Sequence, residues 1–196
     1  GPIGAVEDFL FDKAFDNTHI DTMLPDIFHG SEQVLYPIGK KSGFDQKVID
    51  WTTAASSKDR HSKSINIMDA SSLIGNIRLI KDDHEIDLIR KACDISAEAH
   101  IAAMKAVKEG DSEQNIEGLY IHEFSKRGAR YPAYNPIVAG GENACVLHYV
   151  ENNQMLNDSD LLLVDAGCEY EMYAADITRT FPVSGKFSEE QLKVYE

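Results

Sequence analysis

The sequence is short of positive charge. It contains 19 lysine and arginine residues against 33 aspartate and glutamate residues, which gives a formal net charge of −14 at pH 7. Proteins that bind nucleic acid or anionic membranes need a basic surface to neutralise phosphate groups. We therefore expect neither nucleic acid nor a membrane as the main partner of this protein.

Cysteines and long apolar runs are also scarce. The three cysteines, Cys93, Cys145 and Cys168, are odd in number and lack the spacing of a metal site, which favours reduced thiols in a cytoplasmic protein. No stretch approaches the roughly 18 uninterrupted apolar residues of a membrane-spanning helix. Because the chain begins with Gly1-Pro2, without an initiator methionine or a signal peptide, we expect a cut or processed start.

The first 80 residues contain no phosphate-binding loop, no nucleophile motif and no metal-type cluster. A short helix is expected there from Thr22, as its cap, to Gly30, with Pro25 in the first turn. The pattern of residues 33–38 predicts a strand, and apolar residues at helical spacing predict a second helix over 44–57. Alternating helices and strands favour an α/β unit that serves as scaffold.

Two helices are predicted after this unit. Asp82 and Glu85 form a capping-box pattern, and apolar residues then recur every three or four positions up to Gly110. A second helix is expected over residues 111–128. His100 lies on or beside the apolar stripe of the first helix, where a single histidine is more often a packed core residue than a ligand.

The most informative stretch is LLLVDAGCEYEMYAADITRTFP, Leu161 to Pro182. A short apolar run into Asp165 and an alternating run around Asp176 predict the two arms of a β-hairpin. If the hairpin turns between Tyr170 and Glu171, the two aspartates lie directly opposite each other. Directly opposed residues of an antiparallel pair have Cβ atoms roughly 4.5–5.5 Å apart.

Two ionised carboxylates at that separation repel each other. A shared proton, a basic partner or a metal ion could offset the repulsion, and a solvated pair of surface carboxylates is the simpler alternative. Arg179 is expected on the other face of its strand, which makes it a poor partner. One or two divalent cations are the most economical answer, since oxygen ligands suit such ions.

A second polar segment, ARYPAYNPIVAGGENACVLHYVENN, precedes the hairpin. Its proline and glycine residues predict turns around two short strands, residues 135–139 and 145–149. His148 is expected in the second of these strands, facing opposite to both of its neighbours. The residues alone leave open whether His148 is functional or structural.

Two segments, ARYPAYNPIVAGGENACVLHY and VDAGCEYEMYAADITRTFPVSGKFS, strongly resemble the Xaa-Pro aminopeptidases (aminopeptidase P). These metallopeptidases have the pita-bread fold, like prolidase and methionine aminopeptidase. The resemblance implies an α+β chain in two parts. Residues 1–80 would be part of a creatinase-like α/β N-terminal domain, and residues 81–196 the first half of the pita-bread (creatinase/aminopeptidase-like) catalytic domain.

The resemblance also implies roles for single residues. In that family two aspartates, a histidine and two glutamates hold two divalent metal ions, and Asp165 and Asp176 match the aspartates. We expect manganese, with zinc or cobalt as alternatives. His148 matches a histidine that lies near the substrate and stabilises the reacting amide, and Tyr134 matches a tyrosine that lines the site. Arg60 is the nearest match to an arginine that the N-terminal domain supplies to the substrate pocket.

The implied activity is a metal-dependent hydrolysis of the N-terminal Xaa-Pro bond in peptides with proline at the second position. The chain ends at Glu196, before any residue that could match the downstream histidine and glutamates, so we expect a fragment that is inactive by itself. The alternatives are prolidase, which cleaves only dipeptides, and a metal-free pita-bread binding protein. Because family members are often dimers or tetramers, we expect a homo-oligomer at full length.

Overall fold

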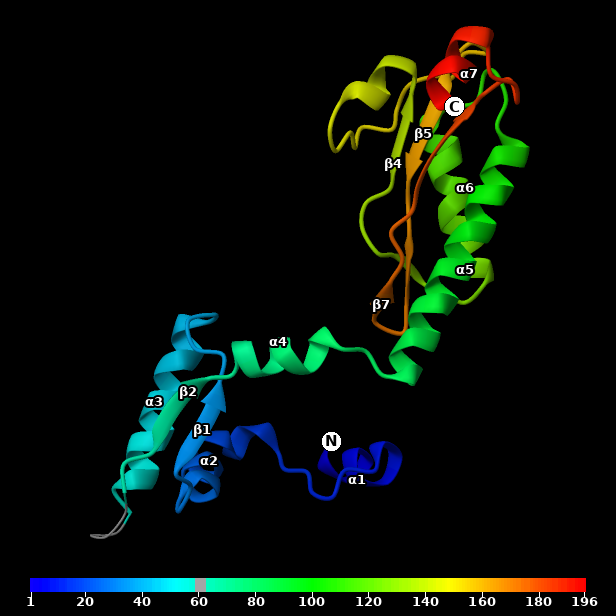
Figure 1. Cartoon of the computed structure of the whole chain (residues 1–196). Helices are drawn as coiled ribbons and strands as arrows, with labels where there is room; N and C mark the ends of the chain where they lie inside the picture. The colour runs from blue at the N-terminus through cyan, green and yellow to red at the C-terminus, as the bar shows by residue number, and fades with distance from the viewer. Residues whose placement is uncertain (59–62) are drawn as a thin grey trace. The chain divides into compact units, whose positions relative to one another are not determined.

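A computed structural model describes residues 1–58 and 63–196 (Figure 1). The chain divides into two compact units, Gly1–Ile80 and Lys81–Glu196. Arg60, the expected substrate-pocket arginine, lies outside the described residues. Within those residues no helix has both the length and the apolar character that a membrane span requires.

The first unit is built on a strand–helix–strand arrangement. Its elements are α1 (Pro2–Phe9), the 3-10 turn η1 (Asn17–His19), α2 (Ile20–Phe28), β1 (Gln33–Tyr36), α3 (Ser42–Ser56), β2 (Asn66–Asp69) and α4 (Ser71–Leu79). Strands β1 and β2 pair in parallel, and α3 connects them. Val48, Trp51 and Ala55 share one face of α3 and are buried. The strand predicted over residues 33–38 and the helix predicted over 44–57 are therefore confirmed within a few residues.

Helix α2 begins earlier than the sequence predicts. The Asp16 carboxylate accepts a hydrogen bond of 2.9 Å from the Thr18 N–H and caps η1, which runs directly into α2 at Ile20. The prediction of Thr22 as the cap is wrong because the chain is already helical when it reaches that residue. Pro25 consequently lies inside α2 and not in its first turn.

The second unit places two helices beside two small antiparallel sheets. Its elements are α5 (Asp83–Ala106), α6 (Glu113–Lys126), β3 (Tyr131–Pro132), β4 (Ile137–Gly140), η2 (Gly141–Cys145), β5 (Leu161–Asp165), β6 (Cys168–Tyr170), β7 (Tyr173–Ala174), β8 (Thr178–Pro182) and α7 (Glu189–Tyr195). One sheet has the order β3-β6-β7 and the other β4-β5-β8. Helices α5 and α6 lie side by side along these strands (Figure 1).

The helix caps of this unit follow from local sequence. The Asp82 carboxylate accepts from the Glu85 N–H at 2.9 Å, and Glu85 accepts from the Asp82 N–H at 2.8 Å, so the predicted capping box is confirmed. Helix α5 ends at Ala106, about one turn before the expected end, because the next residue is extended. Ser112 caps α6, so that helix starts slightly later than predicted.

The core of the second unit lies between the helices and the strands. Tyr120 and Phe124 of α6, Ile95 of α5, and Leu162 and Val164 of β5 are nearly or fully buried there. Alternate residues of β5 point to this core, which leaves Asp165 to point away from it with the other alternate residues. The mixture of helices and strands agrees with the predicted α+β class.

Candidate active site

The hairpin that carries the two aspartates is present, but its register differs from the prediction. Glu171 and Met172 form a two-residue turn in which both residues have positive φ, 48° and 69°. This backbone is typical of the tight hairpin turn whose twist matches the flanking strands. The pairing that follows places Asp165 opposite Thr178, so the predicted direct opposition of Asp165 and Asp176 is wrong. Asp176 is two positions before Thr178, on the same face of its arm.

Both arms of the hairpin are interrupted between the two carboxylates and the turn. Strand β5 ends at Asp165 and β6 starts at Cys168, with Gly167 between them. A Cβ atom on Gly167 would lie 1.8 Å from the Ala175 carbonyl oxygen, so only glycine allows the arms to approach this closely. The register is nevertheless the same on both sides of the interruption, since Asp165 pairs with Thr178 and Glu169 pairs with Ala174.

The two carboxylates converge on one tyrosine hydroxyl. Tyr134, in the loop between β3 and β4, donates a short hydrogen bond to Asp165 Oδ1, and its hydroxyl lies 3.3 Å from Asp176 Oδ1. Burial, and then the hydrogen bond to Asp165, raise the pKa of Tyr134, so its hydroxyl keeps its proton. One hydroxyl has one proton and cannot fully satisfy two carboxylates at once.

The convergent oxygens therefore fit a divalent cation. Among the described residues, the ion pairs involve neither Asp165 nor Asp176, so no basic side chain offsets their charge. Hard oxygen donors that meet at one point are the donor set that such ions select. Within the described residues, however, no group of three or more possible ligands comes together. The part of the chain that the structure describes thus contributes at most two side-chain ligands at this point.

These residues line one pocket of about 340 Å³ together with His148. The other lining residues are Asn135, Ile137 and Val150. Tyr134, His148, Asp165 and Asp176, the residues predicted at the site that the structure describes, thus share one pocket. Carboxylates, a histidine and a tyrosine around one cavity provide hydrogen-bond donors and metal ligands next to a space that a small substrate can enter.

His148 does not lie in a strand, so that prediction is wrong. Residues 141–145 form the 3-10 turn η2, and His148 follows in a further turn with a φ of 56°. Its side chain is exposed at the pocket, whereas Tyr149 is 6% exposed and faces inward. A positive φ is uncommon for a residue other than glycine and is typical of a turn.

A buried glutamate holds the loop that carries His148. Glu113, at the start of α6, is 0% exposed and accepts four hydrogen bonds, from Gly140 N (2.8 Å), Asn143 Nδ2 (2.9 Å), Tyr149 Oη (2.7 Å) and Gln154 N (3.0 Å). Burial would raise the pKa of Glu113, but the hydrogen bonds outweigh it and hold the pKa below the ordinary 4.5. Both ends of the loop and its centre therefore depend on one ionised carboxylate.

The sequence did not reveal this role of Glu113, because an acidic residue in the first turn of a helix is an ordinary feature. His100, by contrast, was expected in the core, and its 3% exposure confirms that prediction. Burial lowers its pKa, which favours the neutral imidazole.

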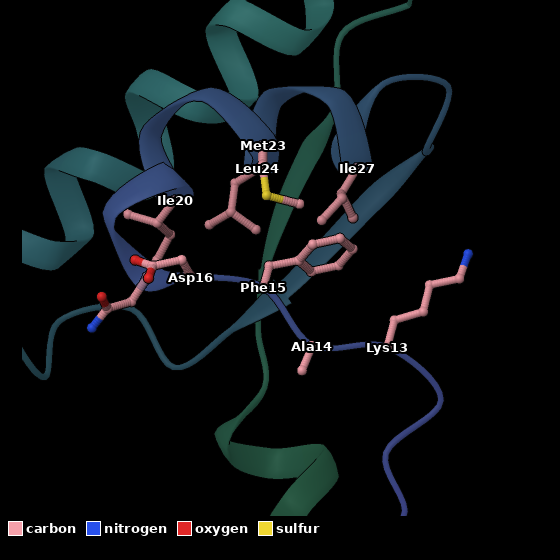
Figure 2. A pocket seen from close by; sticks show the side chains of 9 residues that line it. Lys13, Ala14, Phe15, Asp16, Ile20, Met23, Leu24 and Ile27 are labelled. Carbon is pink, nitrogen blue, oxygen red and sulfur yellow. The ribbon is translucent and has the colours of Figure 1, made fainter. Parts of the chain in front are cut away.

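A second pocket lies in the first unit, where Phe15 faces the apolar side of α2 (Figure 2). Ile20, Met23, Leu24 and Ile27 of α2 are among the residues that line it. Among the described residues, Asp16 is the only acidic residue that lines it, so this pocket lacks a pair of carboxylates like Asp165 and Asp176.

The model of metallopeptidase family M24 matches residues 87–196, which is more than half of the chain and includes every residue of the site. The chain belongs to metallopeptidase family M24. The resemblance to pita-bread metallopeptidases drawn from the sequence is thereby confirmed, and the α+β fold with it.

Relatives of this M24 chain include two curated Xaa-Pro aminopeptidases. The Haemophilus influenzae protein is 53% identical over 130 residues, which are 66% of this chain and 30% of the relative. The Escherichia coli protein is 40% identical, and the match covers 100% of this chain and 45% of the relative. This M24 chain therefore spans less than half the length of these relatives.

Solved structures of aminopeptidase P also match this chain over part of their length. Pseudomonas aeruginosa aminopeptidase PepP matches all of this chain with a TM-score of 0.93 and 42% identity. Zinc-substituted Escherichia coli aminopeptidase P in complex with product matches with a TM-score of 0.92 and 39% identity. In both cases the match covers 45% of the solved chain.

Proposed function

We propose that this chain is the first part of a Xaa-Pro aminopeptidase, which releases the N-terminal residue of peptides with proline at the second position. "Full-length protein" below means the protein that contains this chain and the rest of the catalytic domain. The observation that carries the proposal is the convergence of Asp165 and Asp176 in a pocket shared with His148, in a chain of the M24 family. The names of the relatives support the choice of substrate.

Asp165 and Asp176 are the residues we assign to the metal centre, with two divalent ions, manganese first and zinc or cobalt next. The chain supplies two of the ligands, and the remaining histidine and two glutamates of the family pattern belong to the rest of the full-length protein. Bound metal ions would supply a hydroxide nucleophile near neutral pH and polarise the scissile carbonyl. The carboxylates themselves fix where the cations sit.

His148 and Tyr134 act on the substrate in this proposal. His148 lies in an exposed turn at the pocket, where its imidazole can donate a hydrogen bond to charge that develops on the carbonyl oxygen or the proline nitrogen. Tyr134 closes the pocket beside the carboxylates and keeps its hydroxyl proton, so it can donate to one carboxylate or to a substrate oxygen. The loop anchored on Glu113 holds His148 at the rim.

The test is a peptide assay with the metal-depleted full-length protein. We expect cleavage of a Xaa-Pro-Xaa tripeptide only after a divalent ion is restored, with manganese at least as effective as zinc or cobalt. A Xaa-Ala-Xaa tripeptide serves as the matched control and should not be cleaved. Cleavage of the Xaa-Pro dipeptide alone would favour prolidase, and binding without metal or cleavage would favour a metal-free binding protein.

We also propose a homo-oligomer, dimer or tetramer, in the cytoplasm. The free thiols of Cys93, Cys145 and Cys168 support a reducing compartment. Light scattering of the purified full-length protein and fractionation of its source cells would test the two points separately.

A further inference from the structure

Helix α5 presents two buried polar side chains to the hairpin. Ser96 is 0% exposed and His100 is 3% exposed, and their separation of four residues places them on the same face of the helix. A buried polar side chain lowers stability unless it forms hydrogen bonds, so the partners of these residues show what they do.

His100 contacts both arms of the hairpin at once. Its Nε2 atom lies 3.2 Å from the Ala166 carbonyl oxygen and 3.1 Å from the Ile177 carbonyl oxygen. Carbonyl oxygens only accept hydrogen bonds, so Nε2 carries the ring proton and donates it to both. Nδ1 is then an acceptor, and the Tyr120 hydroxyl donates to it at 2.7 Å.

Tyr120 holds the imidazole from the other side. Its ring meets the imidazole edge to face, with centroids 4.9 Å apart and an interplanar angle of 78°. Tyr120 is 0% exposed, so neither ring can turn without a loss of packing. The orientation of the Nε2–H bond is therefore fixed by residues of α5 and α6.

The two carbonyl groups that His100 contacts belong to the residues next to the two carboxylates of the site. Ala166 directly follows Asp165, and Ile177 directly follows Asp176. Here the regular pairing stops, and the arms are joined by the hydrogen bond from Ala166 N to the Ile177 carbonyl at 3.1 Å. The His100 proton adds a second bridge across the same gap.

We propose that His100, oriented by Tyr120, is a positioning residue that sets the separation and direction of the Asp165 and Asp176 carboxylates for divalent metal ions. His100 does not line the pocket and acts only through the backbone next to each carboxylate. The inference rests on the metal site of the proposed function, and it adds a support for that site from the core. Residues that orient metal ligands typically change metal affinity or activity about 10- to 100-fold when they are replaced.

Ser96 provides a matched control on the same helix face. Its hydroxyl accepts a hydrogen bond of 3.0 Å from the Cys168 N–H and donates one of 3.4 Å to Cys168 Sγ, on the turn side of Gly167. Among the described residues it forms no hydrogen bond with Ala166 or Ile177. Ser96→Ala therefore removes a buried hydrogen bond between α5 and the hairpin without touching the backbone beside the carboxylates.

The experiment measures Mn²⁺ affinity by chelator competition, without peptide, in the full-length protein and four variants. We expect His100→Leu to weaken binding about 10- to 100-fold, and His100→Gln, which keeps a donor near the Nε2 position, to restore part of it. Tyr120→Phe should weaken binding about 2- to 10-fold, the effect of one lost hydrogen bond. Ser96→Ala should bind Mn²⁺ like the wild type. The visible spectrum of bound Co²⁺ should change in His100→Leu and stay unchanged in Ser96→Ala.

Wild-type Mn²⁺ affinity in a folded His100→Leu variant would overturn the inference. If that variant does not fold, Tyr120→Phe decides, since it removes one hydroxyl and keeps the packing; wild-type affinity there would be equally contrary. Equal losses in Ser96→Ala and His100→Leu would reduce His100 to an ordinary core residue. A wild-type protein that binds Mn²⁺ but cleaves no Xaa-Pro peptide would contradict the proposed function alone.

Discussion

The two sides of the pocket are built differently. Asp165 and Asp176 extend from a hairpin whose arms are fixed by backbone pairing, by Gly167 and by the helix packed beneath them. His148 extends from a turn without regular pairing, and the buried carboxylate of Glu113 is the main anchor of that loop. The carboxylate side depends on many small backbone contacts, and the histidine side depends on the hydrogen bonds of one buried carboxylate.

Because of this difference, substitutions on the two sides of the pocket should have different effects on the backbone. The backbone pairing of the hairpin does not depend on the side chains of Asp165 and Asp176, so their replacement should remove a carboxylate and leave the backbone in place. A loop held by one buried charge should change shape when that charge is lost, because its donors are then left without an acceptor.

Asp165→Ala or Asp176→Ala in the full-length protein should abolish peptide cleavage and lower the metal content. Each change removes one of the two carboxylates that converge on the Tyr134 hydroxyl. Asp158, an exposed aspartate in the loop before β5, provides the control, and Asp158→Ala should behave like the wild type. Near-normal turnover with two metals per site in either site variant would refute the assignment.

Gly167→Ala should lower the free energy of unfolding by about 3 kcal/mol or more, because overpacking of this severity exceeds what a core absorbs. The new Cβ would lie 1.8 Å from the Ala175 carbonyl oxygen, and the hairpin arms would have to separate. Gly118→Ala is the matched control: Gly118 lies in α6 with no atom within 4 Å of the added Cβ. It should stabilise the protein by about 0.5–1 kcal/mol. Urea unfolding of both variants measures the contrast, and equal effects would contradict it.

His148→Ala should lower kcat about 10²-fold, the usual effect of losing one donor to a transition state. Metal content should stay unchanged, because His148 lies in the turn after η2 and not on the carboxylate hairpin. Steady-state kinetics with elemental analysis separates the outcomes. Loss of metal would make His148 a ligand, and unchanged kcat would make it structural.

Glu113→Gln should lower the free energy of unfolding by about 2 kcal/mol at pH 7, since an amide nitrogen would face donors that now meet a carboxylate. The folded pKa of Glu113 lies below its ordinary 4.5. The stabilisation is therefore complete above the unfolded pKa and is lost as the pH falls through the folded pKa. The difference between wild type and variant should accordingly shrink in acid. Thermal unfolding from pH 7 to pH 3 measures this difference in stability. Glu109→Gln, at an exposed position, is the control. A difference that grows as the pH falls would contradict the prediction.

The same contrast explains what the sequence could predict. The capping box at Asp82 and the hairpin that bears the aspartates depend on neighbouring residues, and both were predictable from local patterns. The hairpin register was wrong because a two-residue turn at Glu171 and Met172 shifts the pairing of the whole hairpin. The strand predicted at His148 was wrong because Glu113, far away in the sequence, determines the loop. Contacts between residues so far apart in the chain leave no pattern in the sequence around either residue.

The most direct test is anomalous diffraction at the manganese edge from crystals of the full-length protein grown with Mn²⁺. We predict two manganese peaks in the pocket, with carboxylate oxygens of both Asp165 and Asp176 about 2.0–2.2 Å from a metal ion, the range usual for such ligands. Tyr134 should then no longer bridge the two carboxylates. Manganese bound elsewhere, or a pocket in which the Tyr134 hydroxyl still joins two metal-free carboxylates, would contradict the assignment of this site.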